Sequence, residues 1–201
     1  MFLSLARILF TAVFTIFFRW RVYGTENIPT TGGVVIASNH ISLFDPPVIG
    51  TAVPRLIHFM AKEELFQIPV FGWLIKKFNA FPVRRSTADR TAIRTALSLL
   101  ATGNIVGIFP EGTRSKTGKL GSPEPGIAMI VAKAGVPVVP AAVIGTNRVF
   151  RNGCLFPQFI VKFGPPIMVT KGKTDKESME FITTRIMSEI SCLLENQPMY
   201  Q

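Results

Sequence analysis

Short apolar runs alternate along the chain with segments whose apolar residues recur every three or four positions. The short runs predict β-strands, and they cover residues 34–38, 56–61, 105–109, 136–144 and 155–163. The periodic segments predict helices over residues 46–51, 86–102, 126–134 and 175–196. Strands alternating with helices predict the α/β class: a layered domain with a mixed central sheet flanked by helices, plus an apolar N-terminal helix.

The N-terminal segment is apolar over almost its whole length. Its polar side chains form one narrow helical stripe, which consists of Ser4, Arg7, Thr11 and Thr15. A helix over residues 1–18 rises about 27 Å, slightly less than the roughly 30 Å of a bilayer's hydrocarbon core. Arg19, Trp20 and Arg21 follow as an interfacial anchor. We therefore expect a membrane-associating helix over residues 1–20 and a separate globular domain over residues 21–201.

Two other interpretations of this N-terminal segment are a cleaved signal peptide and a core helix. A cleaved signal peptide requires small residues at its end, and the bulky sequence Phe17-Phe18-Arg19-Trp20 fits that requirement poorly. A helix packed into the core of the domain stays open as the alternative. A second apolar and basic stretch, residues 66–81, is equally compatible with a core helix and with a lid that faces the membrane.

Composition narrows the class of partner. The chain has 201 residues, enough for one domain with a real core, and a net charge of +10. This charge predicts anionic partners: a phospholipid surface, a phosphate-bearing substrate or a nucleic acid. We find no nucleic-acid-binding module in the sequence. Cys154 and Cys192 are far apart, match no metal-ligand spacing and are expected to be reduced thiols.

The turn after the first predicted strand, residues 38–47, contains the strongest candidates for a catalytic pair of side chains. His40 and Asp45 are too far around an ideal helix to share a face, but they can meet in a tight turn. Asp45 precedes Pro46, so it is expected to cap the following helix with one oxygen and to accept an imidazole N–H with the other. Such a bond leaves the second ring nitrogen of His40 free to act as a base. His58, inside a predicted strand, is expected to be structural.

A second polar segment, residues 109–115, follows the predicted strand 105–109. In open α/β sheets, sites gather outside the carboxyl ends of the strands, so we expect His40 and Glu111 on one rim. The chain here resembles the glycerolipid acyltransferase family, and within it the bacterial type that acylates lysophosphatidate. Four blocks carry this resemblance in order: N-H-x4-D at 39–45, F-P-V-R-R at 81–85, F-P-E-G-T-R-S at 109–115 and V-P-V-V-P at 136–140.

The resemblance implies an enzyme that moves a fatty acyl group from a thioester to the sn-2 hydroxyl of lysophosphatidate, giving phosphatidate. His40 would be the general base and Asp45 would orient it. The acceptor would contact residues of the arginine-bearing block and the E-G-T-R block, namely Arg84, Arg85, Glu111, Gly112, Thr113 and Arg114. Arg85 matches the family's arginine better than Arg84 does, although the two are adjacent.

The same resemblance implies no metal and no cofactor, because acyl-CoA or acyl carrier protein serves as the donor substrate. Expected partners are an anionic membrane surface and the two substrates, with acyl carrier protein as a further candidate and no nucleic acid. The expected location is the cell membrane, peripheral or monotopic on the cytoplasmic face. Another acceptor, such as glycerol 3-phosphate, another lysophospholipid or an aminolipid, stays open, as does a non-catalytic protein that binds anionic lipid.

Overall fold

The fold is built on one mixed sheet of seven strands. The structure is a computed structural model that describes residues 2–84, 89–124, 126–151, 153–172 and 175–195. The strands are β1 (Arg21–Tyr23), β2 (Val34–Ser38), β3 (Ile57–Lys62), β4 (Phe81–Val83), β5 (Ile105–Ile108), β6 (Val138–Ile144) and β7 (Ile160–Phe163). Their order is β1-β7-β6-β2-β5-β3-β4, and only the β6–β7 pair is antiparallel.

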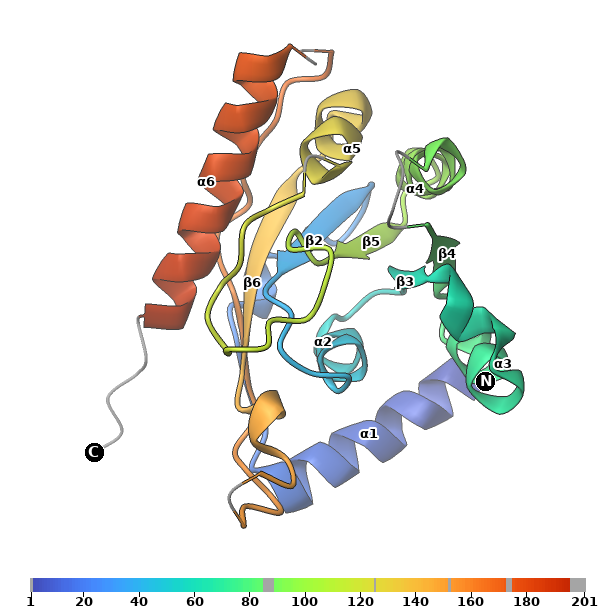
Figure 1. The fold of residues 1–201 in the computed structure, drawn as a ribbon, viewed down its shortest axis with the longest axis vertical. Helices are drawn as coiled ribbons and strands as arrows, with labels where there is room; N and C mark the ends of the chain where they lie inside the picture. Colours follow the sequence, from blue (N-terminus) through green and yellow to red (C-terminus); the bar gives the residue numbers. More distant parts are fainter. Residues whose placement is uncertain (1, 85–88, 125, 152, 173–174, 196–201) are drawn as a thin grey trace.

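Helices cover both faces of the sheet, which confirms the predicted layered α/β class. One face carries α4 (Arg90–Ala101), α5 (Gly126–Ala134) and α6 (Lys176–Glu195). The opposite face carries α1 (Phe2–Phe18) and α2 (Asp45–Ala52), and α3 (Pro69–Lys77) lies beyond the β3–β4 edge (Figure 1).

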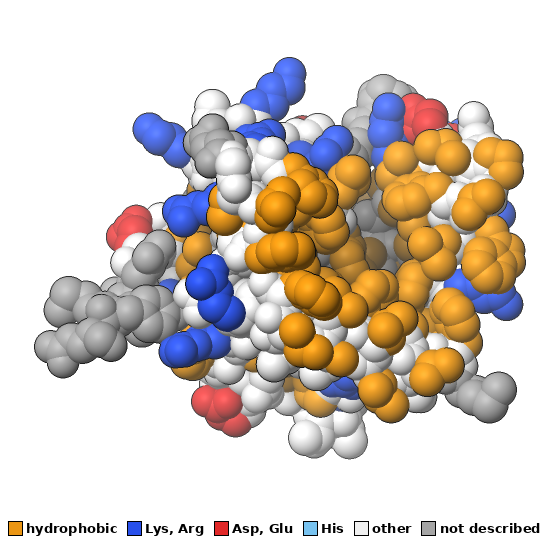
Figure 2. Space-filling model, turned by 90° about the horizontal axis from the view of Figure 1, so that it is seen from below, with side chains coloured by type: hydrophobic (Ala, Val, Ile, Leu, Met, Phe, Trp, Pro, Cys, Tyr) orange, Lys and Arg blue, Asp and Glu red, His pale blue; other side chains and the backbone are white. Residues whose placement is uncertain are grey.

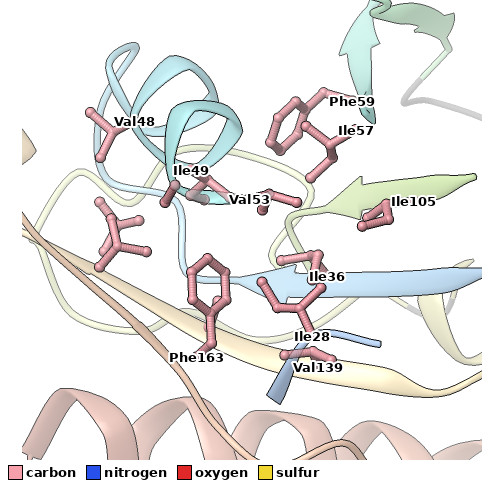
Figure 3. Close-up of a cluster of buried hydrophobic side chains, with 14 of the residues drawn as sticks. Ile28, Ile36, Val48, Ile49, Val53, Ile57, Phe59, Ile105, Val139 and Phe163 are labelled. Atoms are coloured by element: carbon pink, nitrogen blue, oxygen red, sulfur yellow. The ribbon is translucent and has the colours of Figure 1, made fainter. Parts of the chain in front are cut away.

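The central strand β2 is buried on both faces, which explains its unbroken apolar sequence. Val34 and Ile36 pack with α2, whereas Val35 and Ala37 pack with α5 and α6. Figure 3 shows the first of these two cores, where the helix that carries Ile49 lies against the strands. Because β2 is fixed from both sides, its carboxyl end is a rigid platform for the turn that contains the candidate histidine.

The N-terminal helix packs on the core with one side and is exposed on the other. Phe14 and Phe18 are buried against Phe159 of the segment before β7. The opposite side exposes the large apolar side chains of Leu5, Ile8, Leu9 and Ile16. The helix therefore contributes to the core and also presents an apolar surface. No helix among the described residues is both long and apolar enough to cross a membrane.

The stretch of residues 66–81 is not a core helix. It forms the end of η2 (Glu63–Gln67) and then α3, in which only Gly72 is buried. Val70 and Trp73 expose 79% and 55% of their surface. The core interpretation is therefore wrong, because α3 has no sheet face to cover. Its apolar side chains are exposed or half-buried, and Phe78 at its end contacts Phe2 and Phe10 of α1.

Several predicted boundaries differ from the observed ones. The strands predicted over 136–144 and 155–163 begin later, at Val138 and Ile160, and the short edge strands β1 and β4 were not predicted. The helix predicted from residue 86 begins at Arg90, because the carboxylate of Asp89 accepts the N–H groups of Thr91 and Ala92. Residues 86–88 lie outside the described residues.

Candidate active site

The candidate site lies where three strands end on one rim of the sheet. His40 follows β2, Glu111 follows β5, and Thr146 follows β6. The backbone N–H of His40 donates to Oε1 of Glu111 at 2.9 Å, and the N–H of Ser115 donates to the carbonyl of His40 at 2.8 Å. The predicted meeting of the two polar segments is therefore confirmed: the 109–115 segment holds the main chain of His40 from both sides.

Asp45 is fully buried and accepts four hydrogen bonds. Its Oδ2 accepts from His40 Nδ1 at 2.8 Å and from the N–H groups of Ile41 and Ser42 at 2.7 Å. Its Oδ1 accepts from Thr146 Oγ1 at 2.6 Å. The expectation that Asp45 caps α2 is wrong, because Asp45 is the first residue of the helix and its carboxylate turns back onto the preceding turn. Four donors compensate for burying this carboxylate.

The ring of His40 is held in one orientation. Because a carboxylate can only accept, the bond to Asp45 places the proton on Nδ1 and leaves Nε2 with its lone pair. Phe109 stacks on the imidazole with ring centroids 4.0 Å apart and an interplanar angle of 14°. Phe59 stacks in turn on Phe109. The imidazole is therefore fixed both by its tautomer and by its plane.

Glu111 connects the histidine turn with the loop that follows it. Its carboxylate is buried and accepts from the N–H of His40 with Oε1 and from the N–H of Gly121 with Oε2, at 2.9 and 2.8 Å. Because both oxygens face backbone donors, the geometry makes Glu111 a brace between two segments. The next residue, Gly112, turns the chain with a φ of 65°, a conformation that favours glycine.

The arginines predicted to contact phosphate differ in whether their guanidinium groups already have a partner in the protein. Arg114 is exposed on the turn that follows Gly112, and neither Arg114 nor Thr113 has a side-chain hydrogen bond to another described residue. Arg84, by contrast, forms a double hydrogen bond with the carboxylate of Glu63, which raises the pKa of its guanidinium. Arg85 lies outside the described residues. The two arginines thus differ: the guanidinium of Arg84 is paired with Glu63, whereas that of Arg114 has no hydrogen-bond partner among the described residues.

A mostly apolar pocket of about 420 Å³ lies beside His40. It is lined by residues of α1, α2, β3 and α3, and Figure 2 shows hydrophobic side chains bordering a hollow on this face. His40 and Phe109 belong to its wall, and so does Lys62 at the carboxyl end of β3. Sequence reasoning missed Lys62, although its place at a strand end was a usable signal.

The second histidine and the two cysteines lie outside the arrangement around His40. His58 lies in β3, and burial lowers the pKa of its imidazole, which agrees with the structural role expected for it. Cys154 and Cys192 form no disulfide. Among the described residues, no cluster of three or more His, Cys, Asp or Glu side chains is placed to hold a metal ion.

A buried Asp–His pair at the strand ends of a layered α/β domain, next to an apolar pocket, defines a site suited to base catalysis on a lipid-like substrate. Residues 19–144 match the family model described as acyltransferase, which is more than half of the chain. The chain belongs to the acyltransferase family.

Individual relatives agree with this family. The chain is 41% identical to the 1-acyl-sn-glycerol-3-phosphate acyltransferase of Bacillus subtilis over 138 residues, which are 66% of this chain and 68% of the relative. It is 34% identical to a chloroplastic enzyme of the same name from Arabidopsis thaliana, covering 68% of this chain but only 39% of that longer relative. The crystal structure of the 1-acyl-sn-glycerophosphate acyltransferase from Thermotoga maritima superposes with a TM-score of 0.74 at 32% identity, covering 98% of this chain and 81% of that one.

Proposed function

We propose that this protein transfers a fatty acyl group from an acyl thioester to the sn-2 hydroxyl of lysophosphatidate and thereby forms phosphatidate. The observation that carries the proposal is the 2.8 Å contact between His40 Nδ1 and Asp45, beside an apolar pocket. The relatives named for this reaction support the choice of acceptor. No cofactor is required beyond the donor, which is acyl-CoA or acyl carrier protein.

The proposed reaction moves one proton and one acyl group. Nε2 of His40 accepts the proton of the acceptor hydroxyl, while the oxygen of that hydroxyl attacks the carbonyl carbon of the thioester. The tetrahedral intermediate then breaks its C–S bond, and the departing thiolate takes the proton from the imidazolium. Asp45 stabilises that imidazolium through Nδ1. A serine or cysteine nucleophile is unnecessary, because the acyl group arrives already activated.

The apolar pocket is proposed to receive the hydrocarbon chain of a substrate. His40 stands at its wall, so a chain in the pocket would present its reacting end to the imidazole. The side of α3 that lines the pocket contributes Phe71, Leu74 and Ile75. This placement favours the lid interpretation of the 66–81 stretch, because α3 stands between the pocket and the outside.

The acceptor phosphate is proposed to bind Arg114, with Arg85 as a second contact. The carbonyl of His40 accepts from the N–H of Ser115, so the turn that carries Arg114 is attached directly to the histidine. A guanidinium on this turn can therefore meet the phosphate of an acceptor whose hydroxyl lies at His40. Glu111, Gly112 and Thr113 shape this turn and thereby act on the acceptor.

Replacing Arg114 with alanine is expected to raise the KM for lysophosphatidate about ten- to hundred-fold, since a charge-assisted hydrogen bond contributes about 1.5–3 kcal/mol. The KM for the donor should change little, and the fold should persist because Arg114 is exposed. Arg84→Ala is the matched control, because its guanidinium is already paired with Glu63. Steady-state kinetics in which only the donor KM changes would assign Arg114 to the wrong substrate.

We further propose that the protein works at a membrane surface, as a peripheral or monotopic protein on the cytoplasmic face. The product is a lipid with two chains, and α1 exposes an apolar side next to the pocket. Lys76 and Lys77 follow the apolar part of α3, at the level where anionic headgroups would lie.

The double variant Leu5→Gln/Leu9→Gln is expected to release the protein from anionic vesicles without unfolding it. Both side chains are exposed and line no part of the pocket. Deleting α1 would be a poor test, because Phe14 and Phe18 belong to the core. Met168→Gln, on an equally exposed residue near the other core, is the control. Full sedimentation of the double variant with vesicles would show that α1 is not the anchor.

A further inference from the structure

The segment between β6 and β7 carries a second surface that the active site does not use. At its start, Asn147, Arg148, Arg151 and Cys154 line a surface pocket of about 400 Å³. Neither arginine has a side-chain hydrogen bond or ion pair with another described residue, and both side chains are exposed. Two unpaired guanidinium groups around one pocket are suited to a phosphate-bearing ligand.

The same segment exposes large apolar side chains. Phe150 is 75% exposed and has a φ of 58°, a left-handed conformation that is strained for a bulky residue. Two backbone hydrogen bonds hold it there: its N–H donates to the carbonyl of Cys154, and the N–H of Cys154 donates to the carbonyl of Arg151. Strain that presents a phenylalanine to the outside contributes nothing to the core, so it points to a function at the surface.

This apolar surface is continuous with that of α1. Phe156 contacts the rings of Phe17 and Phe18, with centroids 5.3 and 5.7 Å apart, and its carbonyl accepts from Arg19. Figure 1 shows the segment beside the last turn of α1, and Figure 2 shows basic side chains along the edge of the hydrophobic face. Aromatic side chains flanked by arginines are the pattern of a membrane–water interface.

We infer that residues 147–151 and 153–156 form a second membrane-binding element. Phe150, Leu155 and Phe156 enter the acyl region of one leaflet, and Arg148 and Arg151 hold the phosphate of an anionic lipid in their pocket. Together with α1 this element widens the surface that attaches to the bilayer, so it fixes the tilt of the molecule and the direction in which the apolar pocket faces the bilayer. The inference deepens the membrane part of the proposed function and is independent of the chemistry at His40.

The test is vesicle sedimentation of the full chain carrying His40→Ala, so that no lipid is converted. Two vesicle types are used: phosphatidylcholine alone, and phosphatidylcholine with an equal amount of phosphatidylglycerol. Arg148→Gln/Arg151→Gln is expected to lower affinity for the anionic vesicles about 25-fold, from roughly five-fold for each charge. Affinity for the neutral vesicles should change little. Arg94→Gln on α4, also exposed, is the matched charge control and should bind like the parent.

Phe150→Asn tests the apolar part. Asparagine tolerates the left-handed conformation, so the melting temperature should stay or rise while affinity for both vesicle types falls about five-fold. A purely structural role would instead lower the melting temperature. Phe181→Gln on α6, where the side chain is 70% exposed, is the control.

Two results would overturn the inference. In the first, both sets of variants bind vesicles as tightly as the parent. In the second, the Arg148→Gln/Arg151→Gln variant binds vesicles like the parent, but the same variant with His40 restored has a raised KM for soluble acyl-CoA. That result would make the pocket a site for the phosphates of the donor. A failure of the proposed chemistry would appear separately, as acyl transfer that persists in the His40→Ala protein.

Discussion

Replacing His40 with alanine is expected to lower kcat roughly 10²–10⁴-fold, the usual contribution of a general base. The fold should persist, because Asp45 keeps three of its four donors, namely the N–H groups of Ile41 and Ser42 and the hydroxyl of Thr146. Turnover is measured together with a thermal melt, so that lost chemistry is distinguished from lost structure.

His58→Gln provides the matched control for this substitution. His58 is the only other histidine of the chain and does not line the pocket beside His40. The His58→Gln substitution should leave turnover unchanged, even if the melting temperature falls because His58 is partly buried. A folded His40→Ala protein that turns over at a near-normal rate would exclude His40 as the base.

Substituting asparagine for Asp45 is expected to reduce kcat by less than the His40 substitution does, about ten- to hundred-fold, and to lower the free energy of unfolding by about 1–3 kcal/mol. The amide nitrogen cannot replace Oδ2, where it would face three donors. It can replace Oδ1, because the Thr146 hydroxyl can rotate and accept. The geometry therefore survives, but the negative charge that stabilises the imidazolium is lost.

Two further variants make this expectation specific. Asp89→Asn removes a charge from an exposed carboxylate that caps α4, so it should leave turnover unchanged. Thr146→Val alone removes one donor from the buried carboxylate, so it should lower the melting temperature while His40 stays oriented and turnover falls little. An Asp45→Asn enzyme with full activity, or a Thr146→Val protein as stable as the parent, would contradict the assigned arrangement.

The periodicity of the sequence was enough to predict the fold class and the rim on which the site lies. Val34–Ser38 could be recognised as a buried strand because its residues face two cores and are apolar throughout. The short edge strands β1 and β4 could not, because three residues are too few to establish a period. The exposed apolar helix α3 was ambiguous, because a side chain that meets a lipid or a substrate looks the same in sequence as one that meets a core.

Site residues that are close in sequence could be predicted, whereas those that only the tertiary fold brings together could not. His40 and Asp45 are close in sequence, so local geometry could pair them. Thr146 is 101 residues from Asp45, and nothing local indicates that its hydroxyl completes the carboxylate's hydrogen bonds. The same holds for the brace from Glu111 to Gly121, which depends on how the loop after Glu111 folds back. The place of Lys62 at a strand end was a signal, but the pocket whose wall it joins depends on how distant segments meet.

Analysis of the lipid products formed by the purified protein from labelled acyl-CoA tests the central claim most directly. Lysophosphatidate, glycerol 3-phosphate, another lysophospholipid and an aminolipid are offered as separate acceptors, each with the parent and with the His40→Ala variant. The predicted result is labelled phosphatidate from lysophosphatidate, in preference to every other product and reduced at least about a hundred-fold with the variant. Equal or greater labelling of another acceptor, or phosphatidate formed equally by the His40→Ala protein, would contradict it.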